Sequence, residues 1–179
     1  ASRQQLESII HSALMHASLK LKTAALLLVC EIVGVSETKA WTPLLVTTGV
    51  LVQVLQQLAT AQEGELLQEA LQAFIDTATA SPDFFKAQMR DHLEPAKALA
   101  SIARAREGVE DGMRNLALEW LVSYLERKTK WVVKHVRDFA PLVLQCCMDF
   151  MLEMEDSEEV VRAWAARMDD EEGEEDKDE

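Results

Sequence analysis

The chain has 179 residues, enough for about one domain with a buried core, and 49% of them are hydrophobic. Six glycines and four prolines interrupt a composition rich in Leu, Ala, Glu and Gln, which indicates an all-α fold. The formal net charge is −13, and residues 169–179 supply most of it because nine carboxylates there accompany only Lys177. Such a charge disfavours binding to nucleic acid or anionic lipid.

The chain begins within an apolar helical pattern, "LESIIHSALMHASL", and without a Met, so we expect it to be a segment of a longer protein. The most apolar run follows at residues 23–35, "TAALLLVCEIVGV". It has 13 residues and contains Glu31, which is short for a membrane crossing. We therefore predict a core helix there and expect no membrane insertion.

Three predicted helices repeat at a spacing of 46 residues, over 22–33, 68–79 and 114–125. Their apolar residues align at offsets of one, four, five and eight, which together form one face of a helix. The aligned sets are Ala24, Ala70 and Leu116; Ala25, Leu71 and Ala117; Leu28, Phe74 and Trp120; Val29, Ile75 and Leu121; and Ile32, Ala78 and Tyr124. We expect these faces to be buried.

A second set of predicted helices contains a proline, at Pro43, Pro95 and Pro141, and the last two are also 46 residues apart. A proline inside a helix removes one backbone hydrogen bond, so each of these helices is predicted to bend at its proline. The repeating unit is then a pair of antiparallel helices.

A helix pair with a period of about 46 residues falls in the range of HEAT and armadillo repeats, about 40 to 47. The pattern therefore predicts an α-solenoid of three to four stacked pairs over residues 1–168. Residues 169–179 are predicted to be an acidic loop or tail without fixed structure.

Three stretches, "ALQAFIDTATASPDFF", "RNLALEWLVSYLE" and "MLEMED" before an acidic run, resemble the importin-β (karyopherin-β) family of nuclear transport receptors, and its importin five branch in particular. The resemblance covers roughly residues 50–179 and implies a place in the N-terminal half of a longer solenoid. It further implies basic cargo proteins, Ran-GTP and Phe-Gly nucleoporins as partners, and shuttling between cytoplasm and nucleus through the nuclear pore. Three other interpretations stay open: a different HEAT-repeat scaffold, an acidic chaperone for basic proteins, and a helical enzyme.

The resemblance also indicates where partners would bind. The polar residues opposite the aligned apolar faces would line the concave surface that the family uses for cargo and Ran: Glu69, Asp76, Asn115, Glu119 and Glu126. Carboxylates of the terminal run would attract basic partners at long range: Asp169, Asp170, Glu171, Glu172, Glu174, Glu175 and Asp176. The simpler alternatives are a solvated helix face and a solubilising tail. Val160, Val161, Trp164 and Met168 are expected to pack in a core.

The remaining candidates are interpreted as structural. The basic stretch 126–137, "ERKTKWVVKHVR", is predicted to be a solvated turn between repeats, with Trp131 buried. Cys146 and Cys147 lack metal-ligand spacing and are expected to be reduced thiols in the core of an intracellular protein. No nucleotide, metal or nucleophile motif is present, so we expect neither an enzyme nor a cofactor.

Overall fold

The structure, a computed structural model, describes residues 3–37 and 41–153. Its elements are α1 (Arg3–Leu14), α2 (Leu19–Val35), the 3₁₀ helix η1 (Thr42–Thr47), α4 (Thr48–Thr60), α5 (Gly64–Ala80), the 3₁₀ helix η2 (Pro82–Phe85), α6 (Lys86–Asp91), α7 (Glu94–Ala103), α8 (Asp111–His135) and α9 (Phe139–Leu152). The described residues contain helices and no strand, which confirms the all-α prediction.

Contacts divide the chain into two units, residues 1–147 and 148–179. The boundary predicted at residue 168 lies outside the described residues. The description below concerns the first unit.

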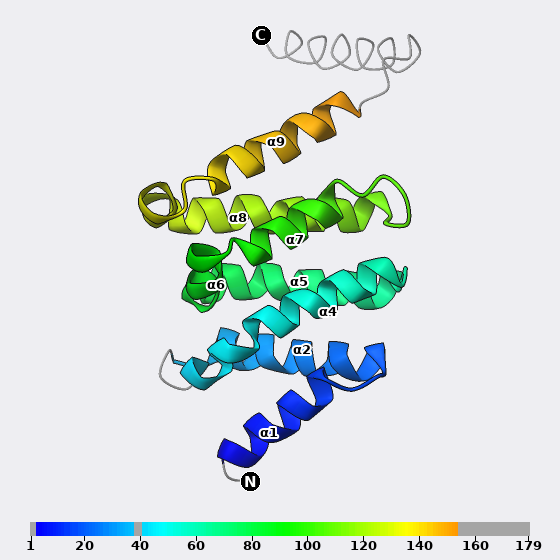
Figure 1. The fold of residues 1–179 in the computed structure, drawn as a ribbon, viewed down its shortest axis with the longest axis vertical. Coiled ribbons are helices and arrows are strands. Elements are labelled where there is room, and N and C mark those ends of the chain that lie inside the picture. The colour runs from blue at the N-terminus through cyan, green and yellow to red at the C-terminus, as the bar shows by residue number, and fades with distance from the viewer. Residues whose placement is uncertain (1–2, 38–40, 154–179) are drawn as a thin grey trace, which may run out of the picture. The chain divides into compact units, whose positions relative to one another are not determined.

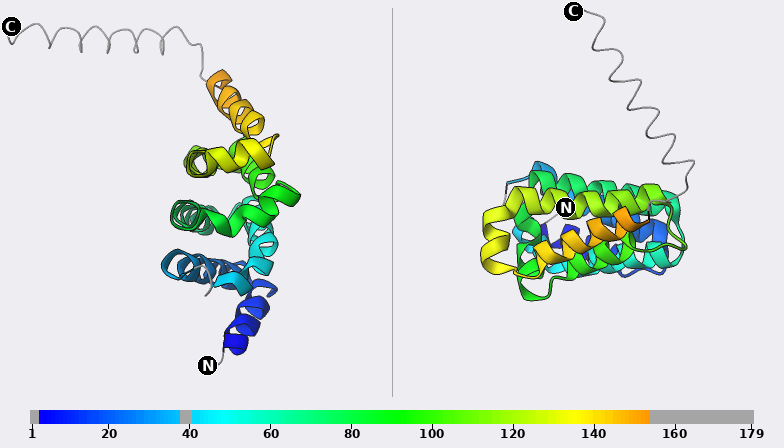
Figure 2. Two further views of the ribbon diagram at one scale, coloured as in Figure 1. Left: turned by 90° about the vertical axis from the view of Figure 1, so that its left-hand side faces the viewer. Right: turned by 90° about the horizontal axis from the view of Figure 1, so that it is seen from above.

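The helices of the first unit form two layers (Figures 1 and 2). In one layer α5 lies between α2 and α8 and packs against both, while the other layer contains α1, α4 and α7. The chain alternates between the layers, and short turns such as residues 61–63 join α4 to α5. Each helix therefore contacts its partner in the pair and the helices of adjacent pairs.

The buried faces follow the predicted offsets, with one correction of register. In α5 the buried residues include Ala70, Leu71, Phe74, Ile75 and Ala78, and Ala117, Trp120, Leu121 and Tyr124 follow 46 residues later in α8. In α2 the same pattern is formed by Ala25, Leu26, Val29, Cys30 and Val33, which precede the α5 set by 45 residues. The predicted spacing of 46 was wrong for this interval, and Leu28, expected in the core, is 43% exposed. A shift of one residue turns a helical position by about 100°, which is enough to move it out of the core.

The prolines begin helices and do not bend them, so the predicted bends were wrong. Pro43 and Pro95 lie at the first positions of η1 and α7. Pro141 is the third residue of α9. The first N–H groups of a helix have no acceptor within it, so a proline there sacrifices no hydrogen bond.

Residues 126–135 of the basic stretch are helical, so the predicted turn was wrong there, and residues 136–137 lie in the connection before α9. Helix α8 continues to His135 with a kink at Lys128, whose backbone angles are φ −124° and ψ 23°. The residue 46 positions earlier is Pro82, where the chain has already left α5 and begins η2. Lysine keeps its backbone N–H, so the chain bends at Lys128 and then resumes the helix.

Within the part of the chain that the structure describes, one segment, Thr42–Thr60, is long and apolar enough to cross a membrane by length and composition alone. It comprises η1 and α4, and its residues Leu51, Val54, Leu55 and Leu58 are buried. Helix α4 contacts α2, α5 and α7 there. Packing inside the helical fold accounts for the apolar composition of this segment.

A buried cluster of aromatic rings joins successive helix pairs, and Phe85 lies at its centre. The ring of Phe85 is 5.3 Å from Phe74 of α5 and 5.2 Å from Trp120 of α8, measured between centroids. It also contacts Phe84 and Tyr124, and all of these rings are fully buried. Most of these contacts are edge-to-face, a favourable geometry that adds about 0.5–1.5 kcal/mol per pair to the effect of burial.

We expect Phe85→Ala to lower the free energy of unfolding by about 3–5 kcal/mol, because it removes a buried aromatic ring and leaves a cavity among four others. Urea unfolding followed by circular dichroism would measure this loss. Val46→Ala is the control, because Val46 is 82% exposed and its truncation should change stability by less than about 0.5 kcal/mol. An equal loss in both variants would contradict the central role of Phe85.

Candidate protein-binding surface

Helix α5 presents a polar stripe to solvent. Glu65, Glu69, Gln72 and Asp76 are exposed and recur every three or four residues, which places them on one face. The opposite face of the helix is apolar and buried. This burial fixes the rotation of α5 and so determines which side chains face solvent.

A shallow hollow of about 630 Å³ lies along this stripe, between α5 and α2. It is lined by Leu27, Glu65, Gln68, Glu69, Gln72, Ala73 and Asp76, so three carboxylates and no cation face it. The side-chain amide of Gln72 donates a hydrogen bond of 3.2 Å to Oδ1 of Asp76 and orients that carboxylate. The hollow therefore has the chemistry to hold cationic groups such as Lys or Arg side chains.

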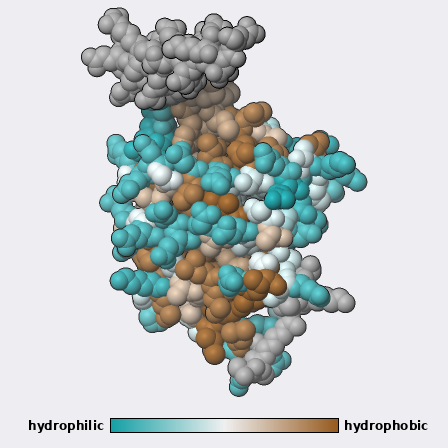
Figure 3. All heavy atoms as spheres, turned by 180° about the vertical axis from the view of Figure 1, so that it is seen from behind, coloured by the Kyte–Doolittle hydropathy of each residue, from teal (hydrophilic) through white to brown (hydrophobic). Residues whose placement is uncertain are grey.

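The hydropathy of the surface around the hollow changes along the layer formed by α2, α5 and α8. Figure 3 views this layer from behind, with hydrophilic atoms over its middle and a hydrophobic area towards the end formed by α1 and α2. Exposed Leu21 and Leu28 belong to α2. The acidic stripe thus lies beside apolar surface, so a partner could add apolar contacts to ionic ones.

The structure places all five predicted site residues on the surface but groups only two of them. Glu69 and Asp76 line the hollow. Asn115, Glu119 and Glu126 are exposed on the neighbouring helix α8 and lie outside it. Sequence reasoning missed Glu65 and Gln72, although their helical spacing from Glu69 and Asp76 is a signal that could have identified them.

The predicted acidic residues Asp169, Asp170, Glu171, Glu172, Glu174, Glu175 and Asp176 lie outside the described residues. The same holds for the predicted core residues Val160, Val161, Trp164 and Met168. The roles of both sets of residues therefore remain predictions from the sequence.

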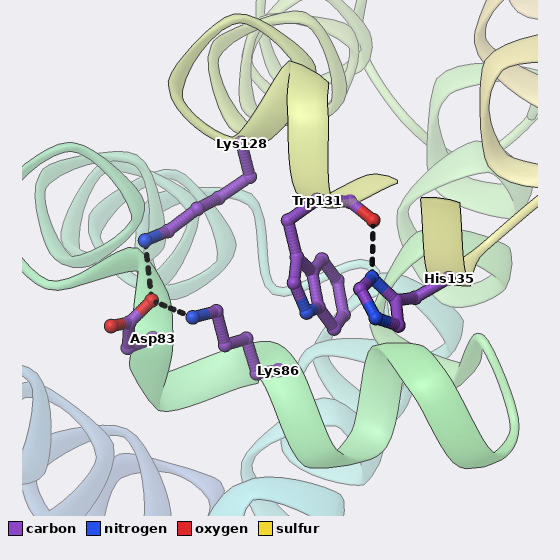
Figure 4. Close-up of polar contacts among 5 residues, drawn as sticks. All are labelled: Asp83, Lys86, Lys128, Trp131 and His135. Atoms are coloured by element: carbon purple, nitrogen blue, oxygen red, sulfur yellow. Dashed lines mark hydrogen bonds and ion pairs between the residues drawn. The ribbon is translucent and has the colours of Figure 1, made fainter. Parts of the chain in front are cut away.

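A second polar cluster surrounds the kink of α8 (Figure 4). The carboxylate of Asp83 in η2 forms ion pairs with two lysines. Its Oδ1 atom lies 2.9 Å from Nζ of Lys86 and also pairs with Nζ of Lys128. The Nζ atom of Lys86 also lies 5.7 Å from the ring centroid of Trp131. Trp131 in turn stacks on His135 with centroids 5.4 Å apart. Trp131 is half-buried, so the prediction of a buried ring was wrong, because the continuing helix directs this face towards solvent.

Lys86 and Lys128 lower the pKa of Asp83. Partial burial alone would raise the pKa of Asp83, but hydrogen bonds from Lys128 and Lys86 and their positive charges outweigh it, and the pKa lies below its ordinary value. Asp83 therefore stays ionised and joins η2 to the kink of α8.

Cys30, Cys146 and Cys147 form no disulfide bond within the described residues. Cys146 is buried as predicted, whereas Cys147 is only half-buried. Burial raises the pKa of Cys30, which packs beneath the α2–α5 interface, to about 12. No cluster of three or more His, Cys, Asp or Glu side chains in residues 3–37 and 41–153 has the arrangement of a metal site.

We expect Asp83→Asn to lower stability at pH 7 by about 1 kcal/mol or less, because the ion pairs are partly exposed. The folded pKa of Asp83 is lowered, so its contribution is complete above the unfolded pKa of about 3.9 and is lost as pH falls through the folded value. Urea unfolding from pH 7 to pH 3 should show the difference between wild type and variant shrinking. Glu107→Gln is the control, and a difference that does not depend on pH would contradict the ion-pair explanation.

No family model, curated protein or solved structure matches the chain. The likeness to the karyopherin-β family therefore remains a prediction from the residues quoted above. What the geometry adds is an all-helical unit with an acidic hollow on one layer.

Proposed function

We propose that this chain is a segment of a HEAT-type α-solenoid that binds basic protein segments, in a nuclear import receptor of the karyopherin-β kind. The observation that carries the binding proposal is the acidic hollow on α5, which contains three carboxylates and no cation among its lining residues. The alternation of helices between two layers, with buried faces 45 and 46 residues apart, supports the repeat interpretation.

Binding would proceed by weak, additive contacts. Each carboxylate of the hollow is exposed, and an exposed ion pair contributes only about 0.2–1 kcal/mol. A partner with several cations would engage Glu65, Glu69 and Asp76 together, and Glu119 and Glu126 on α8 would extend the acidic surface. The affinity would fall with rising salt, as expected of screened charges.

The resemblance supplies the cellular role in this proposal. Basic cargo proteins would bind in the cytoplasm, weak contacts with Phe-Gly nucleoporins would allow passage through the nuclear pore, and Ran-GTP would release the cargo in the nucleus. The acidic residues 169–176 would raise the association rate of basic partners. The protein would act by differential affinity and catalyse no reaction.

Two other binding roles share this surface chemistry. A HEAT-repeat scaffold outside the import receptors would have the same fold with partners unrelated to Ran. An acidic chaperone for histones or ribosomal proteins would use the net charge of −13 to hold basic proteins without nucleotide control. Dependence on Ran-GTP separates the import receptor from both.

We expect the double variant Glu69→Gln/Asp76→Asn to weaken binding of a fluorescein-labelled octa-lysine peptide about three- to tenfold at 50 mM salt, because two ionic contacts are lost. Fluorescence anisotropy would measure the affinity. The acidic residues 169–179 remain in both proteins, so their contribution cancels in the comparison.

Glu107→Gln/Glu110→Gln removes the same charge from the loop before α8, at residues that do not line the hollow, and serves as the control. An equal loss of affinity in the control would show that net charge alone attracts the peptide. That result would overturn the assignment of the hollow as the site.

The nuclear transport role predicts retention of Ran in its GTP-bound form. The complete gene product that contains these residues, immobilised on resin, should retain Ran locked with GTP at least tenfold more than Ran locked with GDP. Equal retention of the two forms, with octa-lysine binding intact, would reject the import receptor and leave the scaffold or the chaperone.

A further inference from the structure

The second half of α8 and the connection that follows it concentrate positive charge in an otherwise acidic protein. Residues 127–137 contain five Lys or Arg and no carboxylate. Asp83 neutralises part of the charge of Lys128, together with that of Lys86. The side chains of Arg127, Lys130, Lys134 and Arg137, termed here the basic edge, are exposed and form no ion pair with the described residues.

The kink exposes these cations together. Lys130 and Lys134 are four residues apart and therefore neighbours on the helix, and Trp131 and His135 form the adjacent row. Had residues 126–137 formed a loop, this alignment would not exist. The helix that resumes after Lys128 places the Trp131–His135 stack beside Lys86 (Figure 4), and Lys130 and Lys134 form the row next to this stack.

Two hollows adjoin the basic edge, and apolar side chains are exposed beside it. A hollow of about 390 Å³ at the kink is lined by residues 126–131. A second hollow, of about 570 Å³, lies where α6 and the start of α7 meet the end of α8, but Asp91, Glu94 and Asp138 line it beside its cations, so it does not itself favour an acidic segment. Val133 is 67% exposed and Trp131 is half-buried, so a bound chain would find apolar contacts as well as charge.

We propose that the basic edge binds an acidic polypeptide segment, through ionic contacts to Lys130, Lys134, Arg127 and Arg137 and through packing on the Trp131–His135 stack. This surface is distinct from the acidic hollow on α5, and the proposal does not depend on the function proposed above. The partner of the basic edge would be acidic, whereas the partner of the acidic hollow would be basic.

Charge and size favour a polypeptide over nucleic acid. Lys130 and Lys134 lie about 6 Å apart along the helix axis at 1.5 Å per residue, and Arg137 follows just beyond the helix end, so the basic edge matches a few residues of an acidic segment. A long polyphosphate backbone would extend past the basic edge onto the acidic remainder of the protein and be repelled there, whereas a short acidic segment would not reach it. One half-exposed tryptophan is also a small stacking platform for successive bases.

The test uses the full chain and a fluorescein-labelled deca-glutamate peptide with one central Phe, at 50 mM salt. We expect Lys134→Glu to weaken binding at least fivefold in fluorescence anisotropy. Lys20→Glu makes the same charge change on exposed Lys20 of α2 and should leave the affinity within twofold. Trp131→Leu should weaken binding of this peptide more than binding of deca-glutamate without Phe.

The chain's own carboxylates at 169–176 have the same chemistry as the probe. The comparison is therefore repeated in a variant with these residues changed to Asn or Gln, and Lys134→Glu should weaken binding in that background too. Equal effects of Lys134→Glu and Lys20→Glu, or no binding of the peptide in either background, would overturn the proposal. Tighter binding of oligo-dT than of the peptide, with the same sensitivity to Lys134→Glu, would also overturn it, in favour of a nucleic-acid surface.

Discussion

The packing of Phe85 against the rings of Phe74 and Trp120 is the constraint on which the first unit depends. Phe85 lies in a single turn of 3₁₀ helix, yet it joins α5 to α8, two neighbouring helices of one layer. Tyr124 extends the contact to Phe139 at the start of α9, with centroids 5.9 Å apart. A short connecting segment thus sets how successive helix pairs pack, because its side chains fill the space between them.

That constraint also determines what reaches the surface. With Phe74 buried beneath Phe85, α5 can rotate very little, and its polar stripe is held towards solvent. The same logic applies to α8, where Trp120 and Tyr124 anchor the first half of the helix. The second half is oriented separately, by the kink at Lys128 and by the ion pair of Lys128 with Asp83. The acidic hollow and the basic edge therefore have different structural supports.

Much of the helical fold could be predicted from the sequence, and the errors have identifiable causes. The offsets of one, four, five and eight located the buried faces of α5 and α8 because polar residues there alternate with apolar ones. They failed by one residue in α2 because Leu26, Leu27 and Leu28 are consecutive, so hydrophobicity alone cannot choose between registers. The kink at Lys128 escaped prediction because a charge-rich stretch is typical both of a turn and of an exposed helix.

The candidate site was predicted only in part. Periodicity placed Glu69 and Asp76 on the surface, where the structure has them. The hollow that joins them also requires Leu27 of α2, some 40 residues away, and no local pattern reports such a contact. The side-chain interactions of Asp83 are likewise nonlocal, since Lys128 lies on a different helix. Helix faces follow from local sequence, whereas grouping of side chains from different helices depends on packing.

The stripe on α5 has a geometric consequence for whatever it recognises. Its polar side chains, Glu65, Glu69, Gln72 and Asp76, recur about once per helical turn of 5.4 Å, whereas alternate side chains of an extended peptide are about 6.6 Å apart. The two repeats drift apart by about 1.2 Å for each successive contact. An extended basic segment lying along α5 would lose register after two or three contacts. A long partner would have to cross from α5 to a neighbouring helix. Each helix would then contact only a short stretch of the partner.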